Sequence, residues 1–419
     1  MRHDFEQMRR SDGGQAAADA ALWNNPDAAD ALQFAGECFA SQPATAPALL
    51  HPLAALCFRR AAESDRSRVA DVLPRIEAVQ AAARHAAKRL AEQGVTPPEA
   101  ESSNRSSRAS AEIRAPGANS SATRGSAAAS RELTPESIAR LQALFESGNQ
   151  QAALGRHAEA EQAFRQVVEA APAIAVAHFN LANACFAQGK FGDAAEAYFH
   201  CLGNTDVAPD DWQLAANAWN NLGNLRTQQA SPRQAWDAFS SAVACDPTLA
   251  SAWWNLGRLA ADDGAAGIAR LCFTESIRLS PPRRIEPRLS LAKLLLDAGR
   301  ADAALAAYDE ILAAAPNAAP ALKGRAFALL KAGRVTEAVH DCLQVIQATP
   351  DDADAFSLLA RANRARGQLT EAQFCDLKSL ELAPRSPGVR SHFLDLRQFD
   401  PAATLDEFLD LTTHWNDVH

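Results

Sequence analysis

The chain has 419 residues, of which 47% are apolar and only 6% aromatic, and its formal net charge at pH 7 is −9. An acidic total of this size argues against a broad surface for nucleic acid or anionic membrane, so neither is expected as a partner. There is no segment with the roughly 20 apolar residues of a membrane-spanning helix, no signal-peptide core and no cysteine spacing typical of a metal site, so we expect a cytoplasmic protein without bound metal.

Residues 1–93 carry alanine-rich segments, among them LHPLAALCFRRAAES and, after Pro74, RIEAVQAAARHAAKRLAEQG. Apolar residues recur at helical spacing in the second segment, and Gly94 stands at its expected end. This region is therefore expected to be helical, either as a small domain or as degenerate repeats.

Residues 94–132 are rich in serine, alanine, arginine, glycine and proline, with almost no large apolar side chain. Such a composition buries too little surface to offset the loss of backbone entropy on folding. We therefore expect a disordered linker here.

From residue 133 the sequence repeats with a period of about 34 residues. All seven copies have alanine at the twentieth position, six have glycine at the fifteenth, and six have proline at the thirty-second. The eighth position is always glycine or alanine, and the fifteenth of the third copy is Ala230. Small residues let two antiparallel helices cross closely, glycine ends the first helix with a positive φ, and proline ends the second helix. The copies begin near Leu141, Ala175, Ala216, Ala250, Ile285, Ala319 and Ala353.

This pattern resembles the tetratricopeptide repeat family over residues 133–384. The resemblance implies an all-α fold, an α-solenoid in which about seven helix-turn-helix repeats wind into a right-handed superhelix. In that family the first helix of each repeat lines a concave groove that binds protein or peptide partners. The resemblance therefore implies a protein-interaction scaffold for extended peptide segments. There is no catalytic motif in the sequence, so neither enzymatic activity nor a cofactor is expected from this chain alone.

Asparagine recurs immediately before leucine in the sequences AHFNLAN, AWNNLGN and AWWNLGR. The resemblance places these sixth-position residues, Asn180, Asn221 and Asn255, in the groove. Because a carboxamide both donates and accepts hydrogen bonds, a row of asparagines is suited to bind the backbone of an extended peptide. The alternative is that they only bond to the neighbouring repeat. The other groove residues expected in this region are Asn183, Asn217, Asn220, Asn224 and Trp254.

Further along the array, cations outnumber acidic residues at the expected groove positions. This pattern predicts a partner with acidic or phosphorylated segments, and the alternative is that the cations are merely solvated. The cations are Arg258, Lys293, Lys323, Arg361 and Arg364, against Glu286 and Asp354.

Residues 385–419 are expected to form capping helices that cover the last repeat. This segment also resembles the stretch between repeats and catalytic domain in bacterial O-linked N-acetylglucosamine transferase-like (SPINDLY-type) glycosyltransferases. Two alternatives therefore stand beside the scaffold. One is the substrate-recognition arm of such a transferase without its catalytic domain, and the other is a two-partner assembly or regulatory factor that uses the N-terminal helices. The residues that carry the resemblance are Ser391, Phe393, Leu394, Pro401, Phe408, His414, Trp415 and His419.

Overall fold

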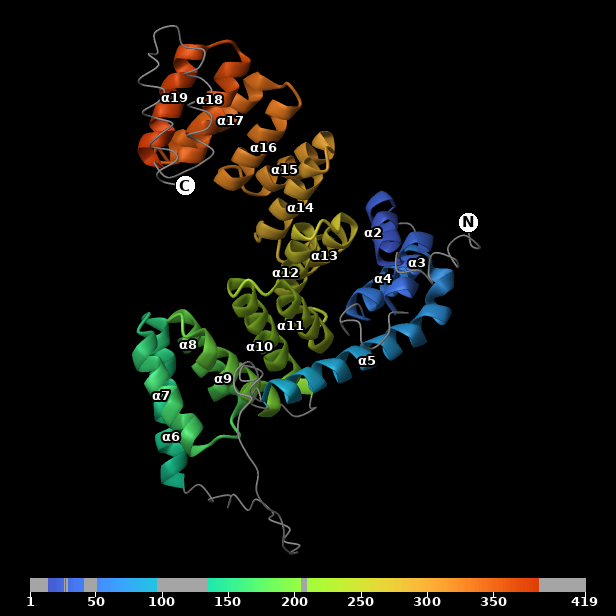
Figure 1. Cartoon of the computed structure of the whole chain (residues 1–419), viewed down its shortest axis with the longest axis vertical. Coiled ribbons are helices and arrows are strands. Elements are labelled where there is room, and N and C mark those ends of the chain that lie inside the picture. Colours follow the sequence, from blue (N-terminus) through green and yellow to red (C-terminus); the bar gives the residue numbers. More distant parts are fainter. Residues whose placement is uncertain are drawn as a thin grey trace, which may run out of the picture. The chain divides into compact units, whose positions relative to one another are not determined.

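The computed structural model describes residues 14–25, 27, 29–40, 51–95, 135–204 and 209–383. All regular elements within these ranges are helices (Figure 1). None of these helices is long and apolar enough to cross a membrane. The predicted capping helices at 385–419, and all but the first two residues of the predicted linker at 94–132, lie outside the described residues.

The chain forms two compact units, and each contains part of the repeat array. The first unit comprises Met1–Ser41, Arg60–Val69 and Thr248–His419, and the second comprises Gln42–Arg59 and Ala70–Pro247. The array helices of the second unit are α6 (Pro135–Ala153), α7 (His157–Ala170), α8 (Ala175–Ala187), α9 (Phe191–Asn204), α10 (Pro209–Gln228) and α11 (Pro232–Cys245). Those of the first unit are α12 (Ala250–Asp262), α13 (Ala266–Leu279), α14 (Glu286–Asp297), α15 (Ala301–Ala314), α16 (Ala319–Lys331), α17 (Val335–Ala348), α18 (Ala353–Ala365) and α19 (Leu369–Leu382).

The N-terminal region is helical where it is described. It contains α2 (Gly14–Asn24), α3 (Ala29–Ala40), α4 (His51–Ser64), the short 3-10 helix η1 (Arg66–Arg68) and α5 (Val69–Val95). The helix expected to follow Pro74 is longer than the sequence suggested, because α5 starts at Val69 and continues past Gly94. Pro74 lies in the second turn of α5, and the helix continues through it although proline removes one intrahelical hydrogen bond there.

The array helices pair as antiparallel hairpins, from α6 with α7 to α18 with α19. Within each unit the first helices of successive hairpins also contact one another. These contacts join α6 to α8 and α8 to α10 in the second unit, and α12, α14, α16 and α18 in the first. The first helices therefore form a row on one face of each unit.

In three of the hairpins the close crossing depends on glycine at the eighth repeat position, where the other four copies have alanine. A Cβ atom built at Gly223 would lie 2.5 Å from the ring of Phe239, which fills that space. Gly148 faces Phe164 in the same way. The same glycine thus allows both the close crossing of the two helices and the burial of the aromatic ring.

The turn between the helices of a hairpin requires a positive φ. The six glycines at the fifteenth position have φ between 74° and 80°. Ala230, in the third copy, adopts φ 52° as well, and no other described non-glycine residue has a positive φ. The turn geometry is therefore kept even where its residue type is unfavourable.

Replacing Ala230 by glycine is expected to raise the free energy of unfolding by about 0.5–1 kcal/mol, because the side-chain clash of a left-handed alanine is removed. Chemical denaturation of the full chain measures the change. The matched control is Ala332→Gly, at the preceding position of the same turn in the sixth copy, where φ is −82°. Glycine there should be neutral or destabilising, and equal effects of the two changes would contradict the explanation.

Candidate protein-interaction surface

In the second unit the asparagines of the first helices bond to one another. Nδ2 of Asn180 on α8 donates to Oδ1 of Asn149 on α6 at 3.0 Å. Nδ2 of Asn221 on α10 donates to Oδ1 of Asn183 on α8 at 2.9 Å. In both pairs the sixth-position asparagine donates to the ninth-position asparagine of the preceding repeat. The inter-repeat bond, which was the alternative to peptide binding, is therefore present, and it leaves the carboxamide oxygens of Asn180 and Asn221 as acceptors.

Asn183 also supports the core. Its Oδ1 accepts a second hydrogen bond, at 2.6 Å, from the hydroxyl of Tyr198, which is 1% exposed. Burial raises the pKa of Tyr198, and a hydrogen bond to Asn221 opposes this shift. Asn183 thus satisfies donors on two helices, which is a structural role.

The Asn183→Ala variant is expected to lose about 1–3 kcal/mol of unfolding free energy, because the buried Tyr198 hydroxyl loses its acceptor. Asn180→Ala breaks an exposed bond and should cost at most about 0.5 kcal/mol. Thermal and urea unfolding of the two variants measure the difference. A cost at Asn180 equal to that at Asn183 would contradict these roles. Asn180 is therefore the cleaner position at which to test peptide binding.

The remaining predicted asparagines differ in exposure. Asn217 and Asn224 are partly exposed, but Asn220 is 8% exposed and Asn255, in the first unit, is 6% exposed. Asn220, Asn224 and Asn255 each take part in a further interaction. The expectation of an open groove position is therefore wrong for the side chains of Asn220 and Asn255, because packing buries them at positions that the repeat register alone does not distinguish.

Two of the five predicted groove cations are neutralised by carboxylates. Nζ of Lys323 lies 2.9 Å from Asp352 and 3.2 Å from Asp354. Arg364 lies 2.8 Å from Asp376, whose side chain is fully buried. Lys323 thus joins α16 to the start of α18, and Arg364 joins the two helices of the last hairpin, so neither is available to an acidic partner as the sequence suggested.

The other three cations, Arg258, Lys293 and Arg361, have no ion pair among the described residues. They occupy the ninth positions of α12, α14 and α18, so they belong to the row of first helices. Arg258 and Lys293 are exposed, and Arg361 is half-buried. Burial and the neighbouring Arg364 lower the pKa of Arg361. The surface therefore carries a positive row, although the chain as a whole is acidic.

Aromatic rings accompany this positive row. Arg258 lies over the ring of Trp254 at 5.1 Å, and the indole Nε1 of Trp254 donates to Oγ of Ser290 on α14 at 2.9 Å. Arg361 lies over the ring of Phe327 at 4.7 Å from its centroid, and Lys331 lies over the same ring at 5.1 Å. Phe327 and Lys331 are missing from the sequence prediction. Phe327 could have been found, because it holds the ninth position of the sixth copy.

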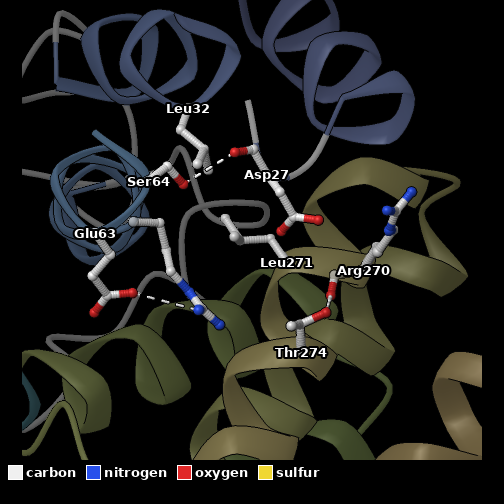
Figure 2. Close-up of a pocket in the computed structure, with 8 residues that line it drawn as sticks. Asp27, Leu32, Glu63, Ser64, Arg270, Leu271 and Thr274 are labelled. Atoms are coloured by element: carbon white, nitrogen blue, oxygen red, sulfur yellow. Dashed lines mark hydrogen bonds and ion pairs between the residues drawn. The ribbon is translucent and has the colours of Figure 1, made fainter. Parts of the chain in front are cut away.

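A cavity of about 160 Å³ lies in the first unit between α13 and the N-terminal helices (Figure 2). Several of its polar groups already have partners. Arg60 lies 3.5 Å from Glu63, the Ser64 hydroxyl donates to the Asp27 carbonyl at 3.0 Å, and the Thr274 hydroxyl donates to the Arg270 carbonyl at 2.8 Å. The cavity is thus a gap between packed helices. The residues that line it are Asp27, Leu32, Arg60, Glu63, Ser64, Arg270, Leu271 and Thr274.

One group of possible metal ligands occurs among the described residues, formed by Glu161, Cys185 and Asp193. Glu161 is already held by Lys190 at 2.6 Å and by Arg165 at 2.7 Å. Burial alone would raise the pKa of Glu161, but these hydrogen bonds and one from Gln188 lower it. Burial raises the pKa of the Cys185 thiol to about 11, which disfavours the thiolate that a metal needs. This group does not form a suitable metal site.

Consecutive helical hairpins, whose turns each contain a residue with positive φ and whose first helices form a row within each unit, define an α-solenoid repeat protein. Tetratricopeptide repeat family models match residues 145–199 and 295–362, both inside the array. The array of this chain therefore contains tetratricopeptide repeats.

Similarity to individual proteins is local. The chain is 27% identical over 143 residues to the mouse protein O-mannosyl-transferase TMTC1, a match that covers 34% of this chain and 15% of that protein. Among solved structures, a tetratricopeptide repeat protein from Parabacteroides merdae has a TM-score of 0.48 and 18% identity, and covers 61% of this chain and 98% of its own. PilF of Pseudomonas aeruginosa has a TM-score of 0.44 and 20% identity, and covers 52% of this chain and 96% of its own.

Proposed function

We propose that the chain is a protein-interaction scaffold, which binds an extended acidic segment along the first helices of the first unit. The observation that carries the proposal is the row of Arg258, Lys293 and Arg361, which have no carboxylate partner in the described part of the chain. Trp254 and Phe327 lie beside these cations and add apolar surface. Acidic side chains, including phosphorylated ones, would pair with the cations.

The geometry of the row suggests a spacing in the partner. Neighbouring packed helices lie about 8–10 Å apart, and an extended chain advances about 3.3 Å per residue. Carboxylates about three residues apart would therefore meet Arg258 and Lys293, and one about six residues further on would meet Arg361, because Phe327 holds the ninth position of the intervening α16. A suitable probe is a fluorescein-labelled peptide of four Glu-Ser-Ala triplets, compared with the same peptide carrying lysine in place of glutamate.

Charge reversal of the row tests the proposal. The triple variant Arg258→Glu, Lys293→Glu and Arg361→Glu should bind the acidic peptide roughly ten- to a hundredfold more weakly, because three ion pairs at exposed or partly exposed cations contribute about 0.2–1 kcal/mol each and reversal adds repulsion. Fluorescence anisotropy with the full chain measures the change, and binding by the parent should weaken as salt is raised.

The control for net charge is the triple variant Arg233→Glu, Arg283→Glu and Arg366→Glu, which changes exposed cations away from the ninth positions. It should leave the affinity within about threefold of the parent. Equal losses in the two triple variants would reject the row as the binding surface, as would equal affinity for the lysine peptide.

In the second unit we propose a separate and weaker peptide contact along the asparagine row, which does not depend on the sequence of the peptide. Asn180 and Asn221 each donate one hydrogen bond to the preceding repeat. Their carboxamide oxygens accept no hydrogen bond from the described residues. Each backbone hydrogen bond contributes about 0.5–1.5 kcal/mol, so this row adds affinity without selecting side chains. Asn180→Ala should lower affinity for both the acidic peptide and its lysine counterpart by a similar factor. A loss confined to one peptide would reject this role.

The local similarity to a mouse protein O-mannosyl-transferase favours a second candidate, the non-catalytic arm of a protein glycosyltransferase. The mass of the endogenous protein in a lysate distinguishes the two candidates. A product near 44.7 kDa supports the independent scaffold, and a much larger product that contains this sequence supports the arm.

A further inference from the structure

Helix α2 is docked on a helix of the array that lies 249 residues away in the sequence (Figure 1). Oδ1 of Asp19 on α2 accepts a hydrogen bond from the backbone N–H of Ile268 at 2.7 Å. Ile268 lies in the first turn of α13, where backbone N–H groups have no acceptor within their own helix. The N-cap residue of α13 is Ala265, which supplies no side-chain acceptor. Asp19 therefore caps α13 from another helix.

The docking depends on a glycine. A Cβ atom built at Gly267 would lie 2.0 Å from the carbonyl oxygen of Asp19. Gly192 holds the same repeat position in the second copy, at the start of α9, and a Cβ atom there would meet nothing within 4 Å. The backbone of α2 can thus approach α13 only because residue 267 has no side chain.

Trp23, one turn further along α2, joins two repeats. Its carbonyl accepts from Arg270 of α13 at 3.0 Å. Its ring is faced by Arg270 at 5.7 Å and by Arg300, the residue before α15, at 4.5 Å. Arg270 belongs to the fourth copy and Arg300 to the fifth. The same two copies are joined through their first helices by the hydrogen bond from Trp254 to Ser290.

We propose that α2 is a built-in clamp, which binds α13 of the fourth repeat and, through Trp23 and Arg300, the residue before α15 of the fifth, and so fixes the spacing of the first helices of these repeats, α12 and α14. Those helices carry Arg258 and Lys293. Release of α2 would loosen the Trp254–Ser290 junction and weaken acidic-peptide binding. The effect on peptide affinity rests on the proposed function, whereas the effect on the junction does not.

The test compares Gly267→Ala with Gly192→Ala in the full chain, with the tryptophan indoles labelled by ¹⁵N and their signals assigned through Trp23→Phe and Trp254→Phe. Alanine favours helix more than glycine does, so neither change should unfold its repeat. Gly267→Ala should speed hydrogen exchange of the Ile268 amide and of the Trp254 indole roughly tenfold each, and Gly192→Ala should change neither. Trp23→Ala, which leaves the array sequence intact, should act as Gly267→Ala does.

Each result bears on a separate part of the proposal. Unchanged exchange at Ile268 in both Gly267→Ala and Trp23→Ala would reject α2 as a docked helix. Faster exchange at Ile268 with an unchanged Trp254 indole would reject the clamp and leave α2 as passive packing. Loosened Trp254 with unchanged affinity for the acidic peptide would reject control of binding. Absence of any binding by the parent chain would reject the proposed function alone, since the exchange measurements need no ligand.

Discussion

Replacing Arg325 by leucine is expected to lower the unfolding free energy of the sixth repeat by about 3–5 kcal/mol, because it strands a buried carboxylate. Asp341 is 1% exposed, and Arg325 holds both of its oxygens at 2.8 Å. These hydrogen bonds, with a further one that Arg325 donates to Asp309, raise the pKa of Arg325. Hydrogen exchange over α16 and α17 measures the local loss, which suits a solenoid better than a single global midpoint.

A double variant gives the control. Arg325 occupies the seventh repeat position, where five other copies have leucine, and Asp341 occupies the twenty-third, where the other copies have alanine or cysteine. The double variant Arg325→Leu, Asp341→Ala restores this pattern and should lie within about 1 kcal/mol of the parent, or above it. If the double variant were as unstable as the single one, lost packing and not the stranded charge would be the cause.

Replacing Gly257 by alanine should cost about 1–3 kcal/mol, because the added methyl group overpacks the crossing of α12 and α13. A Cβ atom at Gly257 would lie 2.6 Å from the ring of Phe273 and 3.2 Å from Cβ of Cys272. Both neighbours are buried, so neither ring nor backbone can move away cheaply. Urea unfolding of the full chain measures the loss.

Gly192→Ala is the matched control for this change as well, since it adds the same methyl group to a helix with nothing within 4 Å. It should be neutral or slightly stabilising. Within the array, phenylalanine at the twenty-fourth position occurs only opposite glycine at the eighth, in the copies with Phe164, Phe239 and Phe273. A harmless Gly257→Ala would show that this pairing has no steric basis.

The hairpins of the array could be predicted from the sequence because their signals are local. Glycine at the fifteenth position, alanine at the twentieth and proline at the thirty-second act within one repeat, and each has a direct conformational reason. Even the exception, Ala230, was visible in the sequence, although its left-handed φ of 52° required the structure. The repeat register also located the positive row, since Arg258, Lys293 and Arg361 share one position.

The tertiary structure decided which of these side chains are available to bind a partner. Lys323 and Arg364 belong to the same predicted set, but Asp352 and Asp376 neutralise them, and Asp376 lies on the opposite helix of its hairpin. Asn183 looks like its neighbours in sequence, yet its oxygen is taken by Tyr198. A repeat position fixes the direction of a side chain, whereas its partners depend on residues that approach from other helices.

The docking of α2 is the feature of the fold that was least predictable from the sequence. Asp19 and Ile268 are 249 residues apart, and α2 has no repeat pattern that assigns it a place. The contact exists because Gly267 leaves room, the first turn of α13 has an unsatisfied N–H, and two arginines face Trp23. The sequence by itself determined the repeating hairpin, whose contacts are short-range and periodic. Only the tertiary structure decided what packs against it, because that choice depends on surfaces that exist once the hairpins have formed.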